Sequence, residues 1–328
     1  MSGVRLQAVA GDEEGMRLDR WFGVHFPQVA FGTLQKLIRT GQVRVDSGRV
    51  KTSTRLSAGQ WVRVPPVEIA VAKATVRTNN ADAEYLRTLI LYEDDDIFVF
   101  NKPHGLASQG GSGTKRHLDG LLKSLTNKKG EAPRLVHRLD RDTSGCLVVA
   151  KSRAAAAWFG EAFKTRAARK IYWAVVAGNP NPKQGRISCF LLKQPSIDDG
   201  EQMVVVPDGT PGAQHSVTYY STTDTAARRF AWVTLKPMTG RTHHLRVHMA
   251  KLGTPIIGDP RYFRLDNWDQ PEGLGEGLHL HARRIALPLR SGKLLDVSAP
   301  LPPHMVQSFA ALGFDPDRFD VQDFDPED

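Results

Sequence analysis

One segment of the chain constrains its fold more than any other: a polar loop that leads directly into a buried strand. Residues 137–145 read HRLDRDTSG, and the apolar run CLVVA follows at 146–150. A polar loop that ends in glycine before such a run is typical of a connection at the edge of a sheet. The pattern therefore presents one carboxylate, Asp140, among arginines at the start of a strand.

Composition limits the class of protein in which that carboxylate can act. The chain has 328 residues, of which 41% are apolar and 24% charged, which is enough for two cores and predicts two domains. The two cysteines, Cys146 and Cys189, lack paired spacing, which argues against a disulfide framework and a thiolate zinc site and fits the cytoplasm. With no signal pattern and no apolar run of roughly eighteen residues, we expect a cytoplasmic protein without a membrane partner.

Charge is unevenly distributed along the chain. The net charge is +9, and residues 16–65 hold nine Lys and Arg against two Asp. Clustered cations bind phosphates by displacing counterions, so nucleic acid is the expected partner. The alternative is a solvated basic surface without a partner. Residues 313–328 are acidic and are predicted to be a disordered tail.

The basic N-terminal block has a recognisable order of elements. Leu18, Trp21 and Phe22 share one face of a first helix, and a second helix over 33–39 stops before a glycine. Alternating apolar and basic residues in 43–51 predict a hairpin.

Over residues 16–66 this block resembles the S-four RNA-binding module, with TGQVRV, GRVK and AGQWVRV in the expected order. The resemblance implies that the second helix and the hairpin hold RNA. The candidate contacts there are Lys36, Arg39, Arg44, Arg49 and Lys51.

Three segments of the second domain carry groups that can converge on one site. Asp140 lies in the polar loop, Tyr172 lies in a strand pattern over 169–176, and Arg246 lies on a helix that follows a turn at 236–242. Leu245 lies on the apolar face beside Arg246. Together the segments supply a carboxylate, a phenol and a guanidinium.

These segments also carry a family resemblance. HRLDRDTSG, RKIYWAVV, TGRTHHLRVHMAKLGTPIIGDPRY (239–262), LHLHARRIALPL and SAPLPPHM resemble motifs of the RluA/RluC/RluD family of RNA pseudouridine synthases, from about residue 89 to residue 305. The order of domains is most similar to the RluC branch. That branch implies uridines of large-subunit (23S) ribosomal RNA as substrate, free or in an assembling particle, and a monomeric enzyme.

The resemblance assigns roles to individual residues. Asp140 is implied as the catalytic carboxylate, Tyr172 as the residue that stacks on the target base, and Arg246 as the cation paired with the carboxylate. Arg138 is implied as the side chain that replaces the flipped base. Arg241 and Leu245 complete the predicted RNA contacts of this domain.

The implied fold is α+β: a small helix-helix-hairpin domain, then a domain with a bent, mixed, mainly antiparallel sheet flanked by helices. The predicted boundaries are an arm at 1–15, the RNA-binding domain at 16–66, a linker at 67–84, the synthase domain at 85–312 and the tail at 313–328.

The implied reaction can be followed as chemistry. The glycosidic bond breaks, uracil turns, and its carbon 5 bonds to the sugar, so nothing is oxidised or lost. One carboxylate that attacks the sugar or removes its proton meets this demand, and we predict no cofactor and no metal. Because a closed pocket disfavours the charged form of a carboxyl group, a nearby arginine is needed to keep it ionised. The target base must also leave the stack.

Each assignment has a structural alternative. Asp140 and Asp142 also fit turn or capping acids, and we assign that structural role to Asp142 alone. Tyr172 also fits an ordinary strand aromatic, and Arg246 a surface residue. A zinc site is disfavoured because no acid or thiol accompanies the clustered histidines, which are His243, His244, His248, His279 and His281. His244 stands where the family usually has glutamine, and its role is left open.

Three alternative functions remain, and different observations would identify them. A non-catalytic RNA-binding factor in ribosome assembly would use the same basic surface and would not need Asp140. A synthase for another RNA would share every motif. A nucleoside glycosylase would release free uracil.

Overall fold

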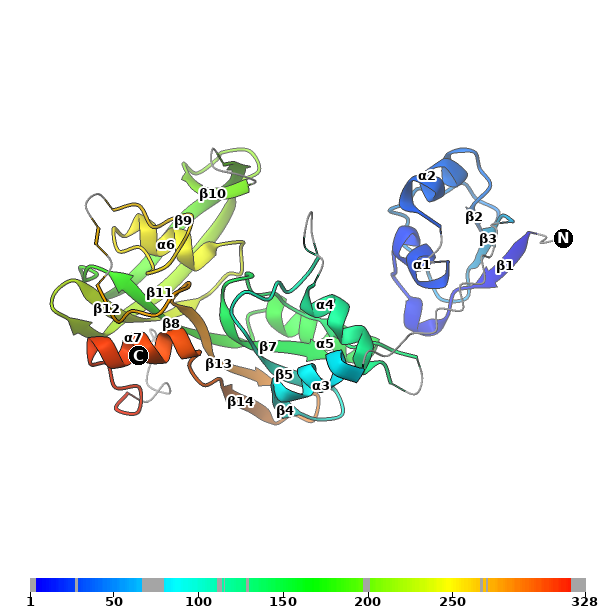
Figure 1. Ribbon diagram of the computed structural model, residues 1–328. Coiled ribbons are helices and arrows are strands. Elements are labelled where there is room, and N and C mark those ends of the chain that lie inside the picture. The colour runs from blue at the N-terminus through cyan, green and yellow to red at the C-terminus, as the bar shows by residue number, and fades with distance from the viewer. Residues whose placement is uncertain are drawn as a thin grey trace. The chain divides into compact units, whose positions relative to one another are not determined.

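The computed structural model describes residues 4–26, 29–66, 80–110, 114, 116–127, 130–196, 201–265, 268–269 and 271–319. The chain divides into two compact units, Met1–Arg77 and Thr78–Asp328. Each unit has its own sheet (Figure 1). Within the described ranges, no helix has the length and apolar character needed to cross a membrane.

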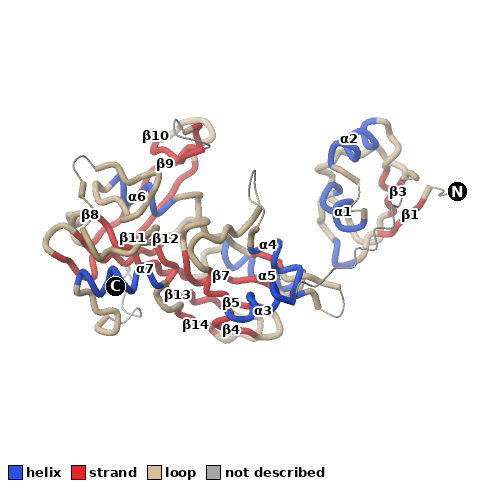
Figure 2. The backbone as a smooth tube through the Cα atoms, in the orientation of Figure 1, coloured by secondary structure: helices blue, strands red, loops and turns tan. Residues whose placement is uncertain are grey.

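The N-terminal unit places two helices on one side of a small antiparallel sheet (Figures 1 and 2). Its elements are β1 (Arg5–Ala8), the 3-10 helix η1 (Gly11–Glu13), α1 (Leu18–His25), α2 (Phe31–Arg39), β2 (Arg44–Val45) and β3 (Trp61–Val64), and the strand order is β1-β3-β2. Leu18, Trp21 and Phe22 are all buried, as predicted for one helix face, and they share a core with Val62 of β3.

The predicted hairpin of this unit forms only at its turn. Asp46 and Ser47 have positive φ angles of 45° and 66°, and Val45 forms an isolated bridge with Gly48. The prediction that 49–51 is the second strand is wrong, because β2 pairs with β3. The four residues of β3 alternate two buried valines with two outward side chains. β3 is therefore a longer strand for β2 to pair with than the three residues 49–51.

Three predicted boundaries also differ from the structure. Residues 5–8, assigned to an arm, form β1 and pair with β3. Residues 313–319, assigned to a disordered tail, are folded, because Phe314 is buried against Trp232 and Phe309. Residues 80–84 of the predicted linker begin a helix, whereas 67–79 and 320–328 lie outside the described residues.

The second unit is built on one large sheet. Its helices are α3 (Asn80–Thr88), α4 (Leu118–Leu121), the 3-10 helix η2 (Leu122–Leu125), α5 (Arg153–Lys164), α6 (His244–Lys251) and α7 (Pro303–Leu312). Its strands are β4 (Ile90–Glu93), β5 (Ile97–Lys102), β6 (Arg134–Leu135), β7 (Ser144–Ala150), β8 (Arg169–Ala177), β9 (Gln184–Pro195), β10 (Glu201–Val206), β11 (Gln214–Ala226), β12 (Phe230–Pro237), β13 (Leu280–Pro288) and β14 (Leu294–Ser298).

The strand order is β10-β9-β11-β12-β8-β13-β7-β5-β4, with β14 on β13 and β6 on β7. The pairing of β13 with β7 is parallel and the other pairings are antiparallel. The mixed, mainly antiparallel sheet is therefore confirmed.

Alternation along β8 places its side chains in two different hydrophobic cores. Tyr172 and Ala174 point to the side covered by Leu245 of α6, whereas Trp173 points to the side covered by Phe309 of α7. Because side chains of a strand alternate between faces, this register places Tyr172 on the same side as α6.

The parallel pairing of β13 with β7 fixes the start of β7. His281 lies opposite Ser144 and Ala282 opposite Gly145. Gly145 has a φ of +106°, and a Cβ atom there would lie 2.3 Å from the Ala282 carbonyl oxygen. Only glycine permits this approach, so the last residue of the polar loop is fixed by the centre of the sheet.

Candidate active site

The loop that carries Asp140 is held in place by buried polar groups. The Ser108 hydroxyl donates to the Leu139 carbonyl at 2.6 Å and accepts from the Leu139 N–H at 3.1 Å. The Lys102 ammonium donates to the Arg141 carbonyl at 2.9 Å. These bonds hold the backbone on both sides of Asp140, whose side chain keeps 19% of its surface exposed.

Lys102 joins this loop to the end of β5. Its ammonium also donates to the carbonyls of Pro103 at 2.9 Å and Leu106 at 2.7 Å. The side chain is fully buried, and burial lowers the pKa of Lys102 to about 7. An ammonium that bonds three carbonyls from two separate segments connects their backbones directly.

Arg246 lies beside Asp140 but is bound by another carboxylate. Its Nε and Nη2 atoms donate to the two oxygens of Asp259, both at 2.7 Å, whereas its Nη1 atom is 4.0 Å from Oδ2 of Asp140. Its guanidinium also lies 5.1 Å from the centre of the Tyr262 ring. Burial tends to lower the pKa of Arg246, but the Asp259 hydrogen bonds together with the charges of Asp259 and Asp140 outweigh it and the pKa is raised, so the cation is preserved.

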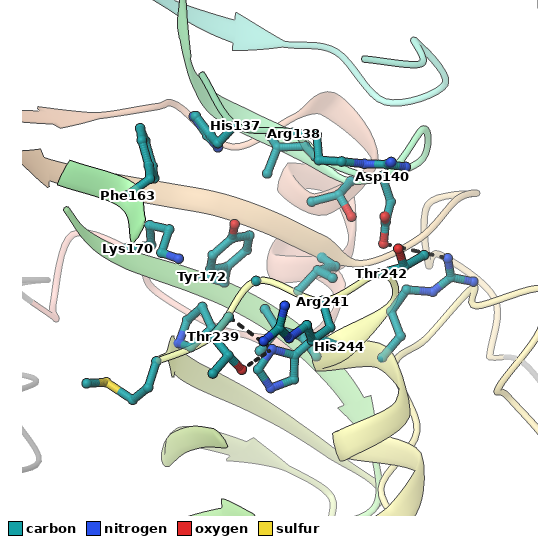
Figure 3. A pocket seen from close by; sticks show the side chains of 18 of the residues that line it. His137, Arg138, Asp140, Phe163, Lys170, Tyr172, Thr239, Arg241, Thr242 and His244 are labelled. Atoms are coloured by element: carbon teal, nitrogen blue, oxygen red, sulfur yellow. Dashed lines mark hydrogen bonds and ion pairs between the residues drawn. The ribbon is translucent and has the colours of Figure 1, made fainter. Parts of the chain in front are cut away.

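Tyr172 lies in the floor of the same site. It is 9% exposed, and burial raises the pKa of its phenol, with a smaller contribution from the charge of Asp140. The phenol is therefore protonated at neutral pH. Figure 3 shows Tyr172 between the Asp140 loop and the loop that carries Thr239 and Arg241.

A cavity of about 460 Å³ joins these groups. Its lining includes one acid, Asp140, and six cationic side chains, which are Arg138, Lys164, Arg166, Lys170, Arg241 and Arg246. Burial lowers the pKa of Lys170 to about 8, with Arg166 contributing. The cavity has the size of a site for a small organic group.

A second cavity, of about 480 Å³, lies on the other side of Asp140. It shares Arg138, Asp140 and Arg246 with the first cavity and adds Arg261 and Arg264. The carboxylate therefore lies in the wall between two basic cavities. Such an arrangement can accept a planar group on one side and phosphates on the other.

Comparisons with known proteins agree with this geometry. Residues 96–251 match the family described as RNA pseudouridylate synthase. The ribosomal large subunit pseudouridine synthase C of Pasteurella multocida (strain Pm70) is 35% identical over 322 residues, which cover 94% of each chain. The chain belongs to the RNA pseudouridylate synthase family.

This synthase is also similar to two further proteins. The ribosomal large subunit pseudouridine synthase C of Escherichia coli (strain K12) is 36% identical over 309 residues, covering 91% of this chain and 93% of its own. The solved structure of human RNA pseudouridylate synthase domain containing 4 is 31% identical, has a TM-score of 0.59, and covers 71% of this chain and 96% of its own.

The structure brings the predicted residues of the synthase domain together. Arg138, Asp140, Tyr172, Arg241, Leu245 and Arg246 all line the first cavity. Asp142 does not line it and pairs with Arg141 at 3.0 Å. In the N-terminal unit, Lys36, Arg39, Arg49 and Lys51 are exposed and Arg44 is partly buried.

The clustered histidines form hydrogen bonds with hydroxyls and carbonyls. His244 lies between Thr239 and Thr218, with its Nδ1 atom 3.0 Å from the Thr239 carbonyl and its Nε2 atom 3.0 Å from Thr218 Oγ1. His248 continues the chain to Ser216 at 2.9 Å. In the ranges described, no group of three or more His, Cys, Asp or Glu side chains is placed to hold a metal ion.

His244 in this synthase holds the wall of the cavity. Thr239 lies in the cavity-lining loop (Figure 3), and Thr218 lies on β11. Burial lowers the pKa of His244 to about 4, so the ring is neutral. A neutral imidazole has one donor and one acceptor nitrogen, which suits a carbonyl on one side and a hydroxyl on the other.

Sequence reasoning missed Asp259 and Lys102. Asp259 follows the buried pair Ile256 and Ile257, and a lone acid directly after a buried run was the only local signal for it. Lys102 follows the apolar run of β5 in the same way. The sequence does not reveal that Asp259 binds Arg246 or that Lys102 binds the Arg141 carbonyl, because these partners come from other segments.

Proposed function

We propose that this synthase converts uridines of large-subunit ribosomal RNA to pseudouridine, with Asp140 as the catalytic carboxylate. The observation that carries the proposal is the position of Asp140 in the wall between two basic cavities, 4.0 Å from Arg246. The printed names of the bacterial relatives support large-subunit RNA as the substrate.

The reaction needs few groups besides the carboxylate. Asp140 attacks the sugar or removes its proton, the glycosidic bond breaks, and the released uracil turns before carbon 5 bonds to the sugar. Carbon 5 then gives up its proton and nitrogen 1 takes one up, so the product is an isomer of uridine. Arg246 lies beside Asp140, and a nearby cation opposes the penalty that a closed cavity places on a charged carboxylate. No atom is lost, so uracil has to stay in the cavity between the two steps.

The target uridine reaches Asp140 by leaving its stack. Unstacking costs a few kcal/mol, which contacts with the flipped base offset. Tyr172 stacks on the uracil, while the exposed Arg138 enters the space that the base has left. Arg241 and Leu245 line the opposite wall of the cavity.

The basic residues of the N-terminal unit hold flanking RNA in this proposal. Lys36 and Arg39 lie one turn apart on α2, and Arg44, Arg49 and Lys51 lie around the following turn. We further propose that the enzyme acts as a monomer in the cytoplasm, on ribosomal RNA that is free or in an assembling particle. The two free cysteines agree with a reducing compartment.

The test is to incubate the protein with unmodified large-subunit RNA and to map pseudouridine chemically. Wild type should form it at discrete sites, and Asp140→Asn should form none while binding the RNA equally well. Absence of pseudouridine with wild type, or undiminished formation with Asp140→Asn, would contradict the proposal. Release of free uracil would identify a glycosylase, and a cellular function that survives Asp140→Asn would identify a binding factor.

A further inference from the structure

The outer face of the N-terminal sheet presents an aromatic side chain beside arginines. Trp61 of β3 is 52% exposed and Leu6 of β1 is 61% exposed. Val62 and Val64 of β3 are buried. Alternation along β3 puts Trp61 and Arg63 on the face opposite the two valines.

Strand register places the neighbours of Trp61 on that same face. Leu6 lies opposite Arg63 and Ala8 opposite Trp61 across β1, while Arg44 lies opposite Arg63 across β2. Figures 1 and 2 show α1 and α2 on the other side of this sheet. The side chains of this face, together with the adjoining turn, line a depression of about 860 Å³.

Backbone hydrogen bonds fix the groups around the indole. The Trp61 N–H donates to the Asp46 carboxylate at 2.8 Å, and the Asp46 N–H donates to the Trp61 carbonyl at 2.9 Å. Arg44 donates to the carbonyls of Gly41 and Ser47, both at 3.1 Å.

Arg63 donates to the Gln42 carbonyl at 2.6 Å. Each guanidinium has five N–H donors. Among the described residues, the hydrogen bonds of Arg44 use two of its donors and the hydrogen bond of Arg63 uses one. The remaining donors are available to a ligand that lies over the sheet.

We propose that this face, made by Leu6, Trp61, Arg63 and Arg44, is a binding site for unpaired nucleotides of the RNA substrate. A base stacks on the Trp61 indole, and Arg63 and Arg44 contact the phosphates that flank it. The inference rests on the proposed function for its RNA partner, and it adds a site to the candidate contacts on α2 and the turn.

Charge and shape favour RNA over a protein segment. The surrounding residues 16–65 hold nine Lys and Arg against two Asp. An indole beside two guanidinium groups, Arg63 and its cross-strand neighbour Arg44, suits a base and the phosphate next to it along a single strand. A base-paired duplex hides the faces of its bases, so the site selects unpaired RNA.

The test measures binding of a short oligoadenylate RNA and of a blunt RNA duplex to the full-length protein. Because oligoadenylate contains no uridine, it reports binding without catalysis. Stacking on one aromatic ring predicts that Trp61→Ala weakens oligoadenylate binding about tenfold and duplex binding less than about twofold. Trp61→Phe should stay within about threefold of wild type.

Trp158 supplies the matched control. It is 47% exposed on α5 of the other unit and lines neither cavity around Asp140. Oligoadenylate should quench tryptophan fluorescence in wild type and in Trp158→Phe but not in Trp61→Phe. Arg63→Gln should lower the slope of log Kd against log salt by about 0.7 for the single strand.

The inference fails if Trp61→Ala leaves oligoadenylate binding unchanged, or weakens single-strand and duplex binding equally. It also fails if the variant slows modification of ribosomal particles but not of naked RNA, which would assign the face to a protein partner. Either result leaves the proposed function standing when pseudouridine still forms. Conversely, Trp61-dependent binding without any pseudouridine formation would refute only the proposed function.

Discussion

At the scale of single residues, Asp259 determines how Arg246 meets Asp140. Two hydrogen bonds of 2.7 Å hold one edge of the guanidinium on Asp259, and only Nη1 faces Asp140, at 4.0 Å. At that distance the cation attracts the Asp140 carboxylate without a direct hydrogen bond. In the proposed reaction, the oxygen atoms of Asp140 therefore remain available for the sugar.

We predict that Asp259→Asn lowers kcat about 100-fold with little change in KM. The asparagine keeps the shape but loses the charge that anchors Arg246, and misplacing a catalytic group by about 1 Å costs that much. Leaving the buried Arg246 without its anion should also lower the unfolding free energy by about 3 kcal/mol. Single-turnover pseudouridine formation and urea denaturation measure the two effects.

The matched control is Asp296→Asn, which removes the more exposed carboxylate that Arg284 contacts between β13 and β14. A surface pair contributes less than about 1 kcal/mol, so kcat should be unchanged. Equal kcat values for the Asp259 variant and wild type would show that Arg246 needs no anchor.

His244 leads to a second prediction, because its two ring nitrogens contact Thr239 and Thr218. His244→Gln should keep kcat/KM within about threefold, since an amide also offers a donor to Thr239 and an acceptor to Thr218. His244→Leu removes one hydrogen bond from the Thr239 carbonyl and one from Thr218, which keeps His248 as a partner. The loss should cost about 1–3 kcal/mol of stability and raise KM as the cavity wall shifts. Steady-state kinetics of both variants check this, and equal damage from Gln and Leu would contradict it.

At the scale of elements, the contact between β7 and β13 is the tightest constraint on the site. Gly145→Ala brings a Cβ atom to 2.3 Å from the Ala282 carbonyl oxygen. The strands have to separate, and we expect a loss of at least about 3 kcal/mol of unfolding free energy together with most of the activity. Denaturation and activity assays on the same sample measure both.

Gly292→Ala is the control for backbone strain alone. Gly292 also has a positive φ, of 82°, but no atom lies within 4 Å of its added Cβ. We expect a loss of about 1 kcal/mol and unchanged activity. If the two variants lose the same stability, the approach of β13 is not what requires glycine at 145.

Local patterns predicted the elements that carry the site but not all of their partners. The sequence revealed the apolar run after Gly145 and the strand pattern around Tyr172, because both are properties of neighbouring residues. Asp259 binds a guanidinium thirteen residues away across a turn, and no periodicity encodes that contact. The fold of Phe314 was missed for the same reason, because its acidic neighbours suggest disorder while its contacts come from β12 and α7.

At the scale of the whole molecule, buried histidines make the synthase unit sensitive to acid. Burial lowers the pKa of five histidines to about 3 or 4, namely His137, His244, His248, His279 and His281. In the unfolded chain their pKa is near 6.5. Between these values the unfolded state binds more protons, so stability is fully present above about pH 6.5 and is lost as the pH falls.

We predict that each of these histidines costs about 2 kcal/mol of unfolding free energy between pH 7 and pH 5. Urea denaturation at several pH values should show an uptake of about five protons on unfolding at pH 5. His248→Asn should reduce that uptake by about one. An uptake below one proton would show that these side chains are already charged in the folded state.

The pairing of β7 with β13 also has a consequence for the time at which the enzyme becomes active. Ser144 and its partner His281 are 137 residues apart. A growing chain that has exposed the Asp140 loop already contains Ser108 and Lys102. The start of β7 gains its β13 partner only on the order of 10 s later at usual rates of translation, after Arg246 and Asp259 have also been made. The nascent enzyme, still attached to one ribosome, is thus inactive toward the RNA around it until its synthesis is nearly finished.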